Sequence, residues 1–287
     1  MNKWLKWTLK IVVTAAALYL TFRKVQWRQT ATLLLSADGI WLLPALLFYN
    51  ASQWASAWRL QYFYGALELF PGFYLNLRLY YRGMFYNLFL PGGIGGDGYK
   101  IHYLFRRYHK PVRELLTATL LDRVNGLIVL GLLIVLIAGS GLLPQGLLPF
   151  PAWLLPVAYL LGMVLFAALL RRFLARYFEV LPRTTLISGL VQGLQLTAMI
   201  CLMKALHIHG PLLPYLLLFL SSSIAAVIPF TIGGMGAREL VFMAGAPLLG
   251  AVPAQAIAVS LLFFLLTAVS SLAGGFISAR NGDNASS

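Results

Sequence analysis

The segment 91–100 reads PGGIGGDGYK, and the segment 229–238 reads PFTIGGMGAR. Aligned without a gap, the two segments share a proline, an isoleucine and three glycines, and each ends in a basic residue. In both places the motif ends one apolar stretch and begins another. Because proline removes a backbone donor and glycine permits unusual dihedral angles, each motif predicts a break between two helices.

The composition around these breaks is that of a membrane protein. The 287 residues are 60% hydrophobic and 10% charged, with a mean hydropathy of +0.80. Soluble domains contain about 25% charged residues, so this chain has too little polar surface to cover a globule. Several stretches approach the roughly 20 apolar residues that a helix needs to cross a bilayer. We therefore predict an all-α, polytopic helical bundle in a membrane.

The apolar stretches divide the chain into spans. We expect a retained first helix before residue 23, and a polar, disordered tail over 281–287. Between them the sequence predicts apolar or amphipathic segments near 40–58, 71–90, 100–113, 114–123, 124–139, 152–170, 185–203, 211–228, 237–249 and 254–278. The spacing favours a single membrane domain over 1–280. It consists of two repeats, about 1–139 and 152–280, each with one broken, re-entrant helix.

Loop charges predict the orientation. The segments 100–113 and 171–183 are basic, whereas 140–151 carries no charge. Because cytoplasmic loops are enriched in lysine and arginine, the two basic segments and both termini are expected on the cytoplasmic side of a bacterial inner membrane. The two motifs then enter the membrane from opposite sides, as in inverted repeats. The net charge of +14 reflects these loops, and we expect no nucleic-acid partner.

The glycines at positions 93, 95 and 98 formally match a dinucleotide-binding fingerprint. That fingerprint requires a preceding strand, and here an apolar helix precedes it. A phosphate-binding P-loop requires Gly-Lys-Ser/Thr, which Gly98-Tyr99-Lys100 does not provide. One property of these nucleotide sites still applies to the segment 91–100. Free N–H groups at the start of a helix attract phosphate. Paired Gly/Pro breaks in corresponding halves are the sequence feature that best indicates a transporter's binding site.

Three motifs follow one another along the chain: Arg82-x4-Asn87-x-Phe-Leu-Pro-Gly-Gly-x-Gly-Gly-Asp97-x-Tyr-Lys100, then Leu121-Asp122-Arg123, then Ile228-Pro229-x3-Gly233-Gly234-x-Gly-x-Arg238-Glu239. Over about 5–280 they resemble the membrane domain of lysylphosphatidylglycerol synthases and related flippase-like proteins. The resemblance implies movement of a lipid between leaflets. The soluble synthase domain does not follow in this sequence, so we expect a transporter and no aminoacyl transfer. Lys100 stands where the resemblance leads one to expect arginine.

The predicted lipid headgroup site combines both motifs. Its members are Arg82, Asn87, Gly95, Gly96, Asp97, Lys100, Gly233, Gly234, Arg238 and Glu239, with Arg78, Asp122 and Arg123 in support. Lys100 and Arg238 occupy equivalent positions in the two motifs, which favours both as phosphate contacts. We predict no catalytic residues, no metal site and no cofactor.

Several of these charges have a structural alternative. Arg78 and Arg82 line a headgroup groove or extend to the cytoplasmic interface. Asp97 pairs with Lys100 or Arg82, or it caps a helix. The alternative for Asp122 and Arg123 is a pair at a cytoplasmic helix end. Glu239 is expected to form an ion pair with Arg238, with contact to a cationic headgroup or proton transfer as alternatives.

The leading functional hypothesis is translocation of a charged or phosphate-bearing lipid between leaflets. The expected partners are anionic, aminoacylated or polyprenyl phosphate lipids, together with a second copy of the chain or a lipid-modifying enzyme. One alternative is a secondary transporter for small solutes or ions. Another is a membrane transferase acting on a lipid-linked substrate, for which Asp97 and Glu239 are the candidate general bases.

Overall fold

A computed structural model describes residues 27–89, 95–140, 151–227 and 236–277. Within these ranges the chain is helical and contains no strand, which confirms the predicted all-α class. The helices are α2 Trp27–Leu35, α3 Gly39–Gly65, α4 Phe73–Phe89, α5 Gly95–Tyr108, α6 Val112–Gly139, α7 Leu154–Phe173, α8 Ala175–Phe178, α9 Leu181–Ala205, α10 Leu212–Val227, α11 Ala237–Leu248 and α12 Pro253–Phe276. The predicted first helix and the tail lie outside the described residues.

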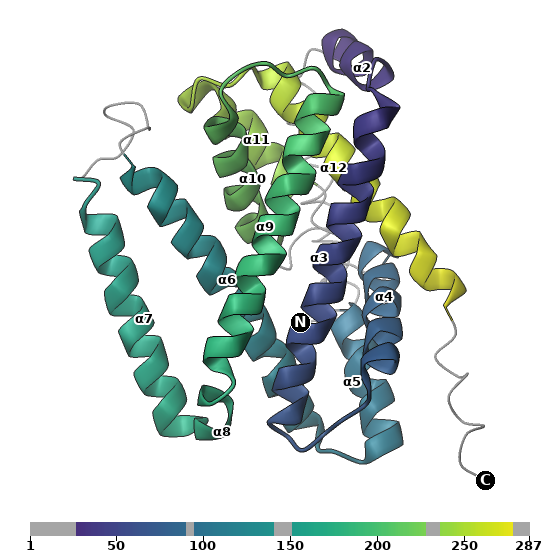
Figure 1. Cartoon of the computed structure of the whole chain (residues 1–287), viewed down its shortest axis with the longest axis vertical. Helices are drawn as coiled ribbons and strands as arrows, with labels where there is room; N and C mark the ends of the chain where they lie inside the picture. Colours follow the sequence, from purple (N-terminus) through teal and green to yellow (C-terminus); the bar gives the residue numbers. More distant parts are fainter. Residues whose placement is uncertain (1–26, 90–94, 141–150, 228–235, 278–287) are drawn as a thin grey trace, which may run out of the picture.

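Long apolar helices form the bundle in Figure 1. Among the described residues α6, α7, α9 and α12 are long and apolar enough to cross a membrane, and α2 with α3, bent by 87°, is a candidate fifth span. Only 6% of the apolar window of α7 is buried within the protein, so that helix is left to face lipid. The predicted multi-pass membrane protein is confirmed. The segments 114–123 and 124–139, predicted separately, are one helix, α6.

Two pairs of shorter helices flank the motifs. Helices α4 and α5 pack together in the lower half of Figure 1, and α10 and α11 pack together in the upper half. Helix α4 has 17 residues and α10 has 16. At about 25 Å each, they are shorter than the roughly 30 Å of bilayer hydrocarbon. Both breaks lie outside the described residues, so the inverted relation between the pairs stays a prediction.

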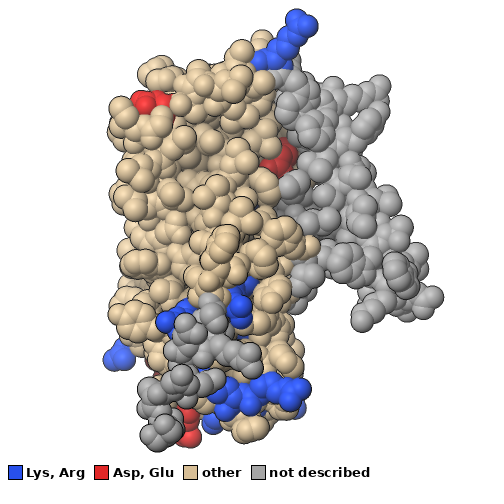
Figure 2. Space-filling model, turned by 90° about the vertical axis from the view of Figure 1, so that its right-hand side faces the viewer, with Lys and Arg blue, Asp and Glu red and all other residues tan. Residues whose placement is uncertain are grey.

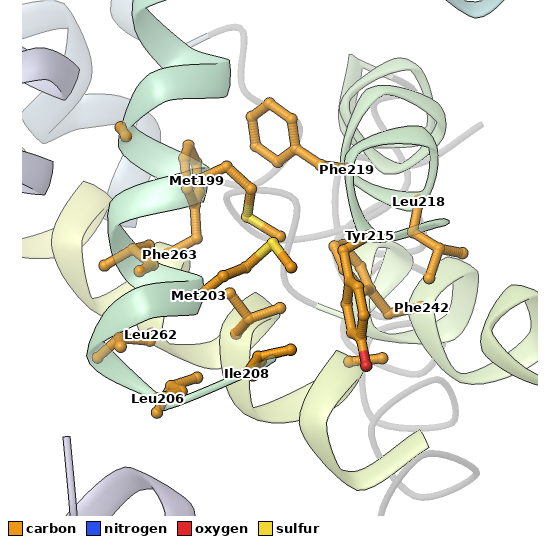
Figure 3. Close-up of a cluster of buried hydrophobic side chains, with 14 of the residues drawn as sticks. Met199, Met203, Leu206, Ile208, Tyr215, Leu218, Phe219, Phe242, Leu262 and Phe263 are labelled. Atoms are coloured by element: carbon orange, nitrogen blue, oxygen red, sulfur yellow. The ribbon is translucent and has the colours of Figure 1, made fainter. Parts of the chain in front are cut away.

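Two apolar clusters hold the bundle together. In the upper cluster Met199 and Met203 of α9 face Phe219 of α10, Phe242 of α11 and Phe263 of α12 (Figure 3). The lower cluster joins the end of α3 to α4, α5 and the start of α6. On α3, the polar residues Gln53, Ser56 and Arg59 lie between the residues of these two clusters, and they line the cavity described below.

Glycines let the short α4 approach its neighbours closely. A Cβ atom on Gly274 of α12 would overlap the backbone of Tyr81 in α4, and one on Gly96 of α5 would overlap Gly83 in α4. Backbone atoms cannot give way as a flexible side chain can. These two contacts therefore fix α4 between α5 and α12.

One end of the bundle is strongly basic. Helices α5 and α7 end there, and α6 and α9 begin there, with α8 between them (Figure 1). Figure 2 shows lysine and arginine side chains gathered at this lower end. The exposed basic residues of these helix ends are Arg106, Arg107, Arg113, Arg171, Arg172, Arg176 and Arg183. We refer to this face as the basic end.

Candidate functional site

A three-membered ion cluster lies where α5 meets α6. The carboxylate of Asp97 contacts Lys100 Nζ at 2.8 Å through Oδ1 and Arg123 Nε at 2.6 Å through Oδ2. Asp97 and Lys100 are buried, whereas the Arg123 side chain is 28% exposed. Asp97 lies in the first turn of α5, one helical turn before Lys100 on the same face. One carboxylate thus holds two cations inside the bundle.

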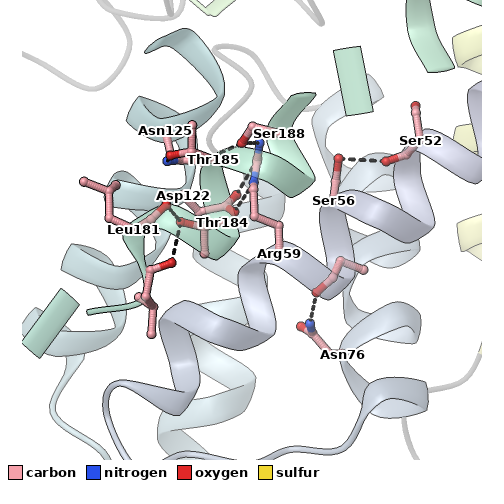
Figure 4. Close-up of polar contacts among 12 residues, drawn as sticks. Ser52, Ser56, Arg59, Asn76, Asp122, Asn125, Leu181, Thr184, Thr185 and Ser188 are labelled. Atoms are coloured by element: carbon pink, nitrogen blue, oxygen red, sulfur yellow. Dashed lines mark hydrogen bonds and ion pairs between the residues drawn. The ribbon is translucent and has the colours of Figure 1, made fainter. Parts of the chain in front are cut away.

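A second ion pair joins α3 to α6 (Figure 4). Arg59 donates from Nε to Asp122 Oδ1 at 2.7 Å and from Nη2 to Oδ2 at 3.1 Å, the bidentate geometry favoured by arginine and carboxylate. Arg59 Nη1 also donates to Ser188 Oγ of α9 at 2.8 Å. Gly126 leaves room for the guanidinium, since a Cβ there would lie 3.2 Å from Nη1.

The polar network continues from Ser188 toward the start of α9. The Ser188 hydroxyl donates to Asn125 Oδ1, and Asn125 Nδ2 donates to Thr185 Oγ1 at 2.9 Å. Ser188 and Asn125 are both buried. The charged pair is therefore supported by neutral hydrogen bonds that involve one further helix, α9, and its geometry is set by α3, α6 and α9 together.

Both ion clusters line one cavity of about 340 Å³. Its wall is built by α3, α4, α5, α6, α9 and α12, with Val227 at the end of α10, and its volume lies within the usual range for small-molecule sites. The charged residues in the wall are Arg59, Asp97, Lys100, Asp122 and Arg123. Three cations against two carboxylates leave one excess positive charge among the described lining residues. Since burial of unpaired charge is costly, the arrangement favours an anionic ligand.

Five residues of the predicted site line this cavity, namely Asn87, Asp97, Lys100, Asp122 and Arg123. Of the alternatives for Asp97, the structure shows the ion pair with Lys100. The interpretation of Asp122 and Arg123 as a helix-end pair is wrong, because α6 begins at Val112, ten residues earlier. Their position well inside an apolar helix is what brings them to the cavity.

A hydrogen bond joins Asn87, near the end of α4, to the first turn of α5. Asn87 Oδ1 accepts a hydrogen bond from the backbone N–H of Gly96 at 2.8 Å. That N–H is therefore satisfied within the protein, while Gly95 begins the helix. Gly233 and Gly234 of the second motif lie outside the described residues. The headgroup role of these glycines stays a prediction.

Arg78 and Arg82 are partly buried on α4, and neither lines the cavity. Arg82 Nη1 donates to Tyr99 Oη at 2.7 Å, and its guanidinium also lies 5.6 Å from the centre of that ring. Arg82 is thus held by a tyrosine of α5, and it does not form the alternative pair with Asp97. Its contact stabilises the α4–α5 pair one residue from Lys100.

The second motif differs from the first in the contacts that its charges make. Arg238 lies 4.8 Å from the ring centre of Phe263 and 5.8 Å from that of Phe219, a cation–π arrangement. Glu239 is buried and accepts from the N–H of Gly236 at 2.7 Å, so it caps the start of α11. The expected ion pair between these two residues is not found among the described contacts. The Glu239 carboxylate points back toward the start of α11, to Gly236, and away from Arg238.

The predicted site did not include Arg59 or the three glutamines of the cavity wall. Arg59 directly follows the predicted segment 40–58, yet it is 6% exposed and pairs with Asp122, 63 positions away. Gln53, Gln192 and Gln195 also line the cavity. The available signal was an unmatched arginine near one end of an apolar helix and an unmatched aspartate in another. Such buried charges are rare unless paired.

The family model for the lysylphosphatidylglycerol synthase TM region matches residues 7–275. The chain belongs to this family. The match covers the described helices up to the last residue of α12, and it agrees with the resemblance seen in the motifs. The search of curated proteins gave no match for the chain. Membership identifies a membrane domain related to lipid handling, and the cavity is its candidate site.

Proposed function

We propose that this membrane domain moves phosphate-bearing lipids between the two leaflets. The observation that carries the proposal is the cavity between the helices with one excess positive charge among its described lining residues, which include Arg59, Lys100 and Arg123. A phosphate headgroup cannot cross hydrocarbon cheaply without such partners. The cavity supplies them at a depth where the outer surfaces of the helices are apolar. The acyl chains can then remain in lipid while the headgroup crosses.

The headgroup is received by exchange of ion-pair partners. In the structure the Asp97 carboxylate occupies the position between Lys100 and Arg123. A lipid phosphate offers the same kind of oxygens to the same two cations. Lys100 acts as a compact point charge, and an arginine at that position would bind phosphate in a bidentate manner. We therefore expect Lys100 to bind the phosphate group through its charge, without a fixed bidentate geometry, and to release it readily.

We propose a transporter and no covalent step on the lipid. The two carboxylates of the cavity, Asp97 and Asp122, are each held in ion pairs with basic side chains. Both oxygens of each carboxylate already contact a basic side chain, so neither carboxylate is placed to take a proton from a substrate, which does not favour a transferase. Mass spectrometry of lipids after incubation with the protein tests this directly. A new lipid product would contradict the proposal.

The basic end is proposed to face the cytoplasm of a bacterial cell, by the positive-inside rule. Helices α4 and α5 then enter the membrane from the cytoplasmic side, and α10 and α11 from the other side (Figure 1). This arrangement corresponds to inverted repeats around a central site, as found in many secondary transporters. Cysteine labelling from either side of intact cells, at Arg172→Cys and at Leu248→Cys, tests the orientation.

The test of transport uses proteoliposomes with fluorescent phosphatidylglycerol and an outer-leaflet quencher. We expect quenching beyond half of the signal with the intact chain, and about half in protein-free vesicles. The double variant Lys100→Gln/Arg123→Gln removes two cavity cations and is expected to approach the protein-free result. Its matched control is Arg106→Gln/Arg113→Gln, which removes two exposed cations at the basic end. Equal rates for the two double variants would contradict the proposed site.

A further inference from the structure

The cavity has an uncharged polar part beside its ion clusters. Gln53 of α3 and Gln192 and Gln195 of α9 contribute amide groups to its wall. The amide nitrogens of Gln53 and Gln195 both donate to Ser52 Oγ, at 3.0 and 3.4 Å, which brings the two glutamines together across the helix interface. We call Gln53, Gln192 and Gln195 the amide layer.

The amide layer lies in the same cavity wall as Arg59, about one to two helical turns farther from the basic end. Gln53 precedes Arg59 by six residues on α3, which runs toward the basic end. Gln192 follows Ser188, the partner of Arg59, by four residues on α9, which runs away from the basic end. At about 1.5 Å rise per residue, both amides are displaced by about 6–9 Å along the helix axes in the same direction.

Gln192 presents an acceptor that the protein leaves unused. Its side chain is 95% buried, and its Oε1 atom has no hydrogen-bond partner among the described residues. Buried polar atoms are rarely left unpaired, so an unpaired one on a residue that lines a cavity favours a ligand that brings a hydrogen-bond donor to it on binding. Hydroxyl and ammonium groups are the donors that lipid headgroups carry.

We infer that the cavity selects lipids in which an anionic phosphate carries an uncharged, hydroxyl-bearing headgroup. This inference rests on the proposed function, and it names the substrate class. The phosphate contacts the cations of the ion clusters, and a headgroup hydroxyl donates to Gln192 Oε1. A glycerol or sugar headgroup places its hydroxyls a few bonds beyond the phosphate, comparable to one helical turn of about 5.4 Å.

A cationic aminoacyl headgroup fits this wall poorly. The two carboxylates in the described lining are already paired with Arg59, Lys100 and Arg123, and the excess charge is positive. An ammonium group beside the amide layer would meet neutral oxygens and nearby cations. The lysyl ester of phosphatidylglycerol should therefore bind more weakly than phosphatidylglycerol itself, although it retains the phosphate.

Binding to the purified full chain in detergent tests the inference without any need for transport. Three lipids with identical acyl chains are compared: phosphatidylglycerol, phosphatidic acid and lysylphosphatidylglycerol. We expect phosphatidylglycerol to bind most tightly. Gln192→Leu should weaken its binding by about 3- to 10-fold, the loss of one hydrogen bond, and change phosphatidic acid binding less than twofold. Gln192→Glu should shift the preference toward lysylphosphatidylglycerol.

Gln255→Leu is the matched control, because Gln255 accepts from Tyr215 Oη at 2.8 Å and does not line the cavity. It should leave the lipid order unchanged. Equal binding of phosphatidylglycerol and lysylphosphatidylglycerol by the intact chain would overturn the inference. So would an equal effect of Gln192→Leu on phosphatidylglycerol and phosphatidic acid. If the lipid order holds but no lipid crosses the bilayer, the inference stands and the proposed translocation fails. If no lipid binds, both fail.

Discussion

The buried pair between Arg59 and Asp122 predicts a large and specific effect on stability. Both side chains are less than 10% exposed, and two charge-assisted hydrogen bonds of 2.7 and 3.1 Å join them. Replacement of Asp122 by leucine leaves a buried guanidinium without its counter-charge, which costs about 3–5 kcal/mol. At about 2–4 °C per kcal/mol, the Tm should fall by about 10 °C.

Thermal unfolding in detergent, followed by circular dichroism, measures this effect. The double variant Arg59→Met/Asp122→Leu removes both charges, and its Tm should recover most of the loss, because an apolar pair of similar volume is nearly neutral. The surface pair of Arg176 and Glu114, 3.7 Å apart and 45% and 34% exposed, is the control. Glu114→Leu should cost less than about 1 kcal/mol. A Tm loss in Asp122→Leu no larger than in Glu114→Leu, or additive losses in the double variant, would refute the reasoning.

Three further predictions concern the Asp97 ion cluster, the close approach of α4 to α12, and Arg82. Asp97→Asn removes the carboxylate between Lys100 and Arg123, so phosphatidylglycerol should bind at least threefold more tightly in a detergent binding titration, while the Tm falls. Gly274→Ala places a Cβ against the backbone of α4, so it should destabilise the fold by about 1–3 kcal/mol and lower the Tm. Gly162→Ala on α7 has open space around the new Cβ, and it should raise the Tm slightly because alanine is the better helix former. Arg82→Gln leaves the cavity wall intact and should reduce lipid translocation in proteoliposomes less than Lys100→Gln does.

The sequence predicted the helices well because its signals are local. Apolar runs, charge-free loops and Pro/Gly breaks placed every described helix from α3 onward except the four-residue α8, mostly within a few residues of its observed bounds. The largest difference is the start of α6. A charged stretch before Asp122 suggested a separate short helix, but it continues into the span because its polar side chains face the cavity and the basic end.

The site was predicted only in part because its contacts are not local. Asp97 and Lys100 are three residues apart on one helix, and sequence spacing found them. Arg59, Asp122 and Ser188 come from three helices, and no spacing rule joins them. The equivalence of Lys100 and Arg238, visible in the aligned motifs, does not extend to their surroundings. One lies among carboxylates in a cavity and the other lies over two phenylalanine rings.

The most direct test of the account is the translocation rate of phosphatidylglycerol in proteoliposomes as cavity cations are removed. The central claim is that Lys100 and Arg123 receive the lipid phosphate inside the bundle. It predicts that the intact chain gives quenching beyond half of the signal, and that Lys100→Gln/Arg123→Gln gives only about half, with an unchanged helical circular dichroism spectrum. Quenching by the double variant as fast as by the intact chain would contradict the claim.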